Sequence, residues 1–272
     1  MSVRSVVQGG AIAVGVLLGA AACSSKPVPF NSPNNTAPAS AAASGTASGA
    51  ASASGAASPS AVPVASQSPL AAASGQLTGT QLQTVLLPKA AFPAGYSLSS
   101  SSALSSGGSI ETAPATYDLA TMSCASFVEH LGNTGFGESA IASNSFAGTG
   151  QAFDQVVYQF ATTAAAAKFV AGIQALSGRC HSFKATDGGS TGTFTLKAAP
   201  GAAVGGHPSL EVDQTAKISG STLTLDTLFA ASGVDVFAAA GVGLDTAPPA
   251  SPPKQTLIYE LMKRQAAAAV LG

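Results

Sequence analysis

A long stretch of residues that cannot form a core decides where this chain can fold. From Ser24 to about Gly75 the sequence is almost entirely Ala, Ser, Gly, Pro and Thr, and Lys26 is its only charged residue. Such a segment buries too little apolar surface to offset the entropy of ordering it. As a flexible coil of about 52 residues, it would span roughly 40 Å. We therefore expect a disordered tether at 23–75 and a folded domain at 76–272.

The residues before the tether have the pattern of an export signal. Arg4 supplies a positive charge, an apolar segment of about 12 residues follows at 11–22, and small residues precede Cys23. This segment is shorter than the roughly 20 residues that a transmembrane helix needs. The string 20–23 reads Ala-Ala-Ala-Cys and resembles the bacterial lipobox, whose Cys is acylated and becomes the new N-terminus. The same alanines satisfy the A-x-A pattern of ordinary secretion, which would leave a free thiol at the mature N-terminus. We expect 1–22 to be a lipoprotein signal peptide, with palmitate on Cys23.

Two cysteines remain if Cys23 carries lipid. Cys124 and Cys180 then form an even pair in an exported chain, which favours a disulfide. A bridge between them would stabilise the fold by roughly 4 kcal/mol in the chain-entropy treatment. The alternatives are a lone catalytic thiol or half a metal site, and both need partner ligands at a suitable spacing that neither cysteine has. We therefore expect a structural bridge.

Charge limits the partners that the chain can recognise. The formal net charge is −1, only 8% of residues are Asp, Glu, Lys or Arg, and there is no basic run. Nucleic-acid binding leaves a basic footprint that is not seen here, so we expect no nucleic-acid partner. The expected contact with the membrane is the lipid anchor. All Phe and Tyr residues except Phe30 lie after position 90, so the material for a core is concentrated there.

Hairpins with helices between them dominate the expected elements after residue 76. Residues 97–109, rich in Ser and Gly, are expected to form a loop. Apolar periodicity and helix-ending residues predict helices at Thr80–Leu87, Asp118–Leu131, Thr162–Leu176 and about Gln255–Val270. Alternating patterns around turn residues predict strands at Ala140–Phe146, Ala152–Phe160, Cys180–Lys184, Thr193–Lys197, Leu210–Ile218, Thr222–Phe229 and Val234–Val242. This order predicts an α+β fold, with an antiparallel sheet flanked by helices, better than a doubly wound sheet.

Few residues offer catalytic chemistry. The string 188–192 matches G-x-S-x-G around Ser190, but it lies between two expected strands, whereas a nucleophile elbow needs a strand before the Ser and a helix after it. The histidines are His130, His181 and His207, and none lies in a recognisable triad or zinc motif. We expect no catalytic residue, no metal and no cofactor.

Glu211 and Asp213 would share one face of their expected strand. Two interpretations stay open for them. They either present carboxylates to a ligand or form a polar outer face of the sheet.

Several short motifs follow one another in a characteristic order. Leu86-Leu87-Pro88 precedes Phe92-Pro93-Ala94-Gly95-Tyr96, and Cys124 lies in the next expected helix. Tyr158-Gln159-Phe160 then ends a strand, and an Ala-rich helix leads into Arg179-Cys180. Over roughly 76–270 this order resembles the PknH-like sensor domain family, which includes the extracytoplasmic domain of a mycobacterial Ser/Thr kinase and free-standing actinobacterial lipoproteins.

The resemblance implies an antiparallel sheet flanked by helices, a cleft for an unidentified ligand and no catalytic activity. Two differences from the family weaken what the resemblance implies about the ligand more than what it implies about the fold. Family members often carry a Trp where this chain has Ser177-Gly178-Arg179, and they often have two disulfides where this chain can form one.

The expected function is therefore that of a non-enzymatic cell-envelope lipoprotein, anchored at the extracytoplasmic face of the cell membrane, with a sensor-like or ligand-binding domain. Its partner would be an unknown small molecule, lipid or cell-wall ligand. One alternative is a secreted hydrolase that uses Ser190 or a histidine. Another is a lipid or glycolipid carrier, which would need a deep apolar cavity of some hundreds of Å3.

Overall fold

The computed structural model describes residues 67–72, 75–105, 117–130, 135–187 and 190–271. The expected signal peptide, the expected lipidation site Cys23 and most of the expected tether lie outside these residues. The first described segment already contacts the domain, because the Leu70 N–H donates to the Gly205 carbonyl at 2.9 Å. Gln67 adds two side-chain hydrogen bonds, one from its amide to the Gln255 carbonyl and one from the Gly205 N–H to its own carbonyl.

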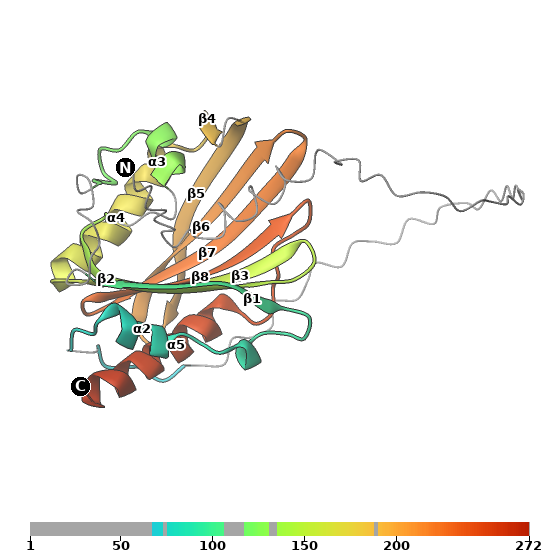
Figure 1. Cartoon of the computed structure of the whole chain (residues 1–272). Helices are drawn as coiled ribbons and strands as arrows, with labels where there is room; N and C mark the ends of the chain where they lie inside the picture. The colour runs from blue at the N-terminus through green and yellow to red at the C-terminus, as the bar shows by residue number, and fades with distance from the viewer. Residues whose placement is uncertain (1–66, 73–74, 106–116, 131–134, 188–189, 272) are drawn as a thin grey trace, which may run out of the picture.

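Eight antiparallel strands form one sheet in the order β1-β2-β3-β8-β7-β6-β5-β4. Figure 1 shows this sheet as strongly curved, with β1 to β3 turned away from the direction of β5 to β7. The strands are β1 (Ser97–Ser105), β2 (Glu138–Ala147), β3 (Gln151–Phe160), β4 (Phe183–Asp187), β5 (Ser190–Val204), β6 (His207–Ile218), β7 (Ser221–Ser232) and β8 (Asp235–Leu244). The expected antiparallel α+β fold is confirmed.

Helices cover both faces of the sheet. The helices α2 (Gly79–Val85) and α5 (Lys254–Leu271) lie on one face, and α3 (Cys124–His130) and α4 (Thr163–Arg179) lie on the other (Figure 1). A short 3-10 turn, η1 (Lys89–Ala91), follows α2. Each face has its own apolar cluster, one centred on α2 and α5 and one on α4. The central strand β8 is buried along nine of its ten residues, because both clusters pack on it.

Local capping explains where two of the helices begin. Thr78 and Gln81 form a reciprocal capping box at the start of α2, each side chain bonding to the other's backbone N–H. Thr162 caps α4 by accepting a hydrogen bond from the Ala165 N–H at 3.1 Å. The helix α4 extends past Gly178, which was expected to end it, and stops at Arg179.

The disulfide predicted from the cysteine count is present. Cys124 in α3 and Cys180, directly after α4, are bonded, with their Cα atoms 5.6 Å apart. Arg179 reinforces this junction, because its guanidinium donates to the backbone carbonyls of Leu119 and Met122 at 3.0 and 3.1 Å. The segment around α3 is therefore held to the C-terminal end of α4 by one covalent bond and two hydrogen bonds.

The prediction of a loop at 97–109 is wrong for its first nine residues, which form the edge strand β1. The backbone of β1 pairs with β2, and hydroxyl contacts add to this pairing, as between Ser102 and Ser143 at 2.9 Å. Serine-rich composition hides such a strand, because main-chain pairing with a neighbour creates it rather than an apolar face.

The helix expected at Asp118–Leu131 is also shorter in the structure. The chain makes a turn at Asp118 and starts α3 only at Cys124. The Ser123 hydroxyl accepts a hydrogen bond from the Ser126 N–H at 3.1 Å, which is the contact of an N-cap. Ser123 thus begins a new helix instead of continuing an earlier one.

Candidate functional site

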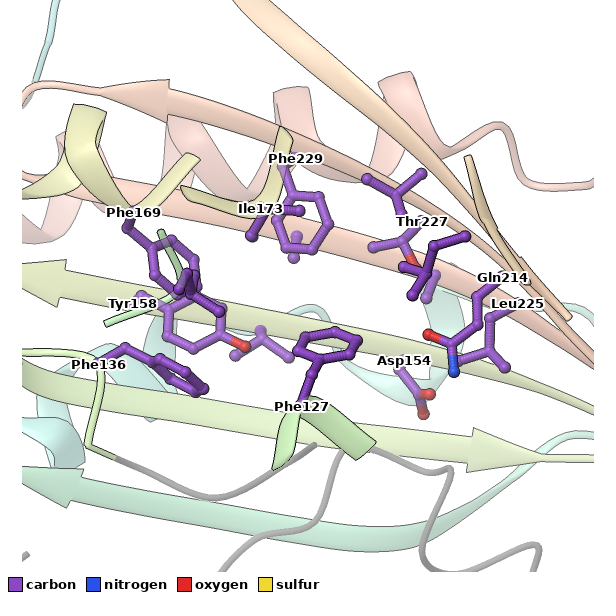
Figure 2. A pocket seen from close by; sticks show the side chains of 16 residues that line it. Phe127, Phe136, Asp154, Tyr158, Phe169, Ile173, Gln214, Leu225, Thr227 and Phe229 are labelled. Atoms are coloured by element: carbon purple, nitrogen blue, oxygen red, sulfur yellow. The ribbon is translucent and has the colours of Figure 1, made fainter. Parts of the chain in front are cut away.

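A half-open apolar pocket lies between the concave face of the sheet and the helices α3 and α4. Its volume is about 90 Å3. Figure 2 shows side chains converging on it from both helices and from the strands β3, β6 and β7. The lining residues are Leu119, Phe127, Phe136, Asp154, Val156, Tyr158, Phe169, Ile173, Leu196, Val212, Gln214, Leu225, Thr227, Phe229, Ala238 and Ala240.

Strand alternation decides which side chains enter the pocket. In β3, Asp154, Val156 and Tyr158 point to the pocket, because residues two apart lie on the same face of a strand. The next strand in the sheet, β8, contributes Ala238 and Ala240 to the lining of the pocket. Their methyl groups are smaller than the side chains on the neighbouring strands and form the floor of the pocket. The space above them is the pocket.

One end of the pocket is aromatic. The ring centroids of Tyr158 and Phe169 are 4.9 Å apart, and those of Phe136 and Phe169 are 5.8 Å apart. Figure 2 shows these rings together with Phe127 and Phe229 around one part of the cavity. Such contacts favour an apolar or aromatic group of a ligand.

The other end carries polar side chains. The amide of Gln214 and the carboxylate of Asp154 point into this end of the pocket, and Thr227 lies near them (Figure 2). Gln214 is 6% exposed and Asp154 is 4% exposed. Their placement gives a mainly apolar cavity a small number of polar groups, which is the usual composition of a small-molecule site.

The hydroxyl of Tyr158 points along the pocket toward Phe127 (Figure 2). Burial, reinforced by the negative charge of Glu138, raises the pKa of Tyr158 well above its usual value. The hydroxyl therefore keeps its proton and can donate a hydrogen bond. Within the part of the chain that the structure describes, neither this hydroxyl nor the Gln214 amide has a hydrogen-bond partner.

The wall of the pocket is held by the junction between α3 and α4. Phe127 lies three residues after the bridged Cys124, so the disulfide positions its ring over the sheet. Leu119 packs against Gly172 of α4 so closely that a Cβ added there would lie 2.8 Å from the Leu119 Cβ. Only glycine permits this approach, so Gly172 places another wall residue.

The candidate residues whose side chains the structure describes do not form a hydrolytic site. Ser190 begins β5 and follows the strand β4, so the G-x-S-x-G string connects two strands and is no nucleophile elbow. The side chain of His181 is exposed, and His130 is the last residue of α3.

His207 lies close to a serine, as a hydrolytic base would, but the ring nitrogen that faces the serine already carries a proton. Its Nε2 lies 3.0 Å from the Leu70 carbonyl oxygen and 3.2 Å from the Ser232 hydroxyl. A carbonyl oxygen only accepts, so Nε2 carries the proton and cannot take one from Ser232. His207 holds the segment before α2 in place and lies outside the pocket.

Glu211 and Asp213 share one face of β6, as expected, and this face is opposite to the pocket. Lys254, at the start of α5, forms ion pairs with Glu211 at 3.1 Å and with Asp226. Partial burial, together with Asp226 and Glu211, raises the pKa of Asp213. The carboxylates thus belong to an ion-pair cluster that fastens α5 to the sheet.

Sequence reasoning missed the residues that line the pocket. One signal was present, since Asp154 is the one charged residue of its strand. Gln214 and Tyr158 gave no signal, because their strands are brought together only by the order β3-β8-β7-β6. Among the described residues, no group of His, Cys, Asp and Glu side chains could hold a metal ion. No described helix is both long and apolar enough to cross a membrane.

The fold and the pocket define the class of protein as a single-disulfide α+β domain with a half-open apolar pocket. A scan of protein-family models and a search of curated proteins find no match to the chain. Two solved structures are similar in fold. The extracellular domain of PknH from Mycobacterium tuberculosis is 13% identical, with a TM-score of 0.43, over 72% of this chain and 98% of that one. An uncharacterised protein from Mycobacterium smegmatis, an Rv0999 ortholog, is 11% identical, with a TM-score of 0.37, over 69% of this chain and 96% of that one.

Proposed function

We propose that this protein is a non-enzymatic, lipid-anchored protein of the cell envelope whose domain binds a small ligand in the pocket. The observation that carries the ligand-binding part is the half-open apolar cavity with buried polar groups at defined positions. A cavity of this kind costs stability, because its lining forgoes the contacts that a filled core would make. The small alanine side chains at its floor are therefore better explained by a ligand that occupies the cavity than by the packing of a core.

The location outside the cytoplasm is proposed on three observations. The N-terminal residues have the pattern of a lipoprotein signal ending at Cys23. The other two cysteines are joined in a structural disulfide, which persists in oxidising compartments and is rare in the cytosol. The Ala, Ser, Gly and Pro composition of the segment between Cys23 and the domain suits a tether that lifts the domain away from the membrane.

The two alternatives have less support. For the hydrolase, the Nε2 of His207 is committed to the Leu70 carbonyl and is not available as a base toward Ser232. The lipid or glycolipid carrier needs a cavity of some hundreds of Å3 to enclose its ligand. The pocket has about 90 Å3, which is below that range, although a neighbouring hollow of about 220 Å3 shares its residues Leu119, Phe136 and Phe169.

Native mass spectrometry of the full mature protein, isolated from its own membranes, tests the ligand-binding part. The expected result is a small-molecule adduct on the wild type that Ala240→Leu lacks, because the larger side chain fills the pocket from its floor. Ala171→Leu is the matched control, since Ala171 is exposed on α4 and outside the pocket. Ala238→Leu is a second filling variant if Ala240→Leu folds poorly. The same adduct on all four proteins would contradict the proposal.

A further inference from the structure

Two nearly buried side chains carry polar atoms that open into the pocket. Tyr158 is 4% exposed and Gln214 is 6% exposed, and no hydrogen bond within the described residues reaches the Tyr158 hydroxyl or the Gln214 amide. Both polar groups face the space of the pocket, where a group of a ligand can form a hydrogen bond with them.

We propose that the ligand is an uncharged molecule with a compact apolar part of about one ring and at least one hydroxyl or carbonyl group, which Tyr158 or Gln214 binds. This inference rests on the proposed function, because it names the chemistry of the occupant of the same pocket. The apolar part packs against the rings of Phe127, Phe169 and Phe229, and the polar group meets one of the two side chains (Figure 2).

The size of the pocket limits the apolar part. A dry cavity of about 150 Å3 lined by Leu, Ile and Phe takes up benzene. This pocket has about 90 Å3 and is half open. A single ring can therefore enter with one edge facing the opening, and this is the size of apolar group that the pocket alone accommodates.

The charge of the lining limits the polar part. The described residues of the lining include no Lys, Arg or His, so an anionic ligand would find no cationic partner among them, and the acidic residue of the lining, Asp154, lies at the polar end. Asp154 already has an interaction within the protein, so it does not require a cation. Transfer of any ion from water into a cavity lined mostly by Phe, Leu and Ala is costly unless the ion is paired there. An uncharged ligand avoids this cost and still satisfies the two amphoteric groups, because both a phenol hydroxyl and an amide can donate and accept.

Four ring-sized probes of similar shape test the inference on the full mature protein. They are p-cresol, toluene, p-toluate and benzylammonium, and their dissociation constants are measured by ligand-observed NMR. The wild type is expected to bind p-cresol at least about fivefold more tightly than toluene, in line with one hydrogen bond recovered. It is expected to bind both charged probes more weakly than toluene.

The variants Tyr158→Phe and Gln214→Leu locate the hydrogen bond. Removal of the group that binds the hydroxyl brings p-cresol to the affinity of toluene and leaves toluene binding unchanged within about twofold. Ser102→Ala, on the distant edge strand β1, is the control and changes neither constant.

Three results would overturn the inference. The first is equal affinity of the wild type for p-cresol and toluene, and the second is tightest binding of a charged probe. The third is a p-cresol preference that survives in both variants. None of these results touches the proposed function, which the adduct comparison between the wild type and Ala240→Leu decides separately.

Discussion

At the scale of single residues, the most unusual group is a buried carboxylate on the face of the sheet opposite to the pocket. Asp235, the first residue of β8, is fully buried and accepts hydrogen bonds from the amides of Gln159 at 3.0 Å and Gln265 at 2.9 Å. The carbonyl oxygen of the Gln159 amide accepts from the Leu77 N–H at 2.8 Å. One polar chain therefore links the segment before α2, the sheet and α5.

Asp235 makes the stability of the domain depend on pH. Burial raises its pKa to about 6, although both amides favour the charged form. Since the unfolded chain has the usual value near 3.8, the native state holds this proton more tightly. The free energy of unfolding should fall by about 3 kcal/mol from this group as pH rises from about 4 to about 6, and then level off. Urea unfolding at a series of pH values measures this slope.

Two variants assign the slope to its source. Asp235→Asn cannot ionise and should remove most of the decrease between pH 4 and pH 6. Asp213→Asn is the comparison, because the pKa of Asp213 is also raised but the residue lies on an exposed face. We expect Asp213→Asn to change the slope little. An unchanged slope in Asp235→Asn would show that the buried carboxylate does not control this dependence.

Gln155 joins the segment after α2 to the centre of the sheet. Its side-chain carbonyl accepts from the Leu87 N–H, and its amide donates to the Leu87 carbonyl, both at 2.9 Å. Gln155→Leu leaves both buried backbone groups without partners, so the free energy of unfolding should decrease by about 2 to 4 kcal/mol. Gln83→Leu removes one exposed hydrogen bond, to Ser101, and should change stability by less than about 0.5 kcal/mol. Equal effects in chemical denaturation would contradict the importance of Gln155.

At the scale of elements, the disulfide holds one wall of the pocket. The short helix α3 contributes Phe127, and its connection to α4 depends on the Cys124–Cys180 bond and on Arg179. Replacement of both cysteines by Ser should reduce the free energy of unfolding by up to about 4 kcal/mol, since the bond closes a loop with a sequence separation of 56.

Urea unfolding with and without reductant measures the same effect on the wild type and does not require the variant to fold. Amide exchange should then lose protection first in α3, because the bond joins this helix directly to the end of α4. A change below about 1 kcal/mol, with protection in α3 retained, would show that the bond is not needed to hold the wall.

The elements that the sequence predicts well are those with a local cause. Hairpins such as β2 and β3 combine an alternating pattern with turn glycines, and α4 combines apolar spacing with a Thr162 cap. The strand β1 was missed because its nine residues depend on pairing with β2, a contact across the long segment between them. The start of α3 was misplaced because apolar spacing continues through Ser123, where the cap restarts the helix.

At the scale of the whole molecule, the fold class followed from the order of elements and the pocket did not. The pocket forms where four strands meet in the order β3-β8-β7-β6, so residues more than eighty positions apart in sequence, such as Tyr158 and Ala240, line one cavity. The floor of the pocket depends on alanines that look like ordinary strand residues. A sequence pattern does not reveal such a cavity, because the cavity depends on side chains far apart in the sequence that leave space between them.

The lipid anchor is a prediction about the whole chain. Cys23→Ala should move the protein from the membrane fraction to the soluble exported fraction, because the mature chain then has no site for acylation. Palmitate labelling, with and without globomycin, provides the direct measurement. The control is the double variant that combines Cys124→Ala and Cys180→Ala and keeps Cys23. Continued membrane association of Cys23→Ala, with label still incorporated, would contradict the anchor.

The central claim is that the pocket is a ligand site, and alanine methyl NMR of the full mature protein with p-cresol tests it most directly. Ala238 and Ala240 lie at the floor of the pocket, whereas Ala171 is exposed on α4. The account predicts saturable shifts of the Ala238 and Ala240 methyl signals and an unchanged Ala171 signal. Shifts that do not saturate, or that are equal at all three alanines, would contradict it.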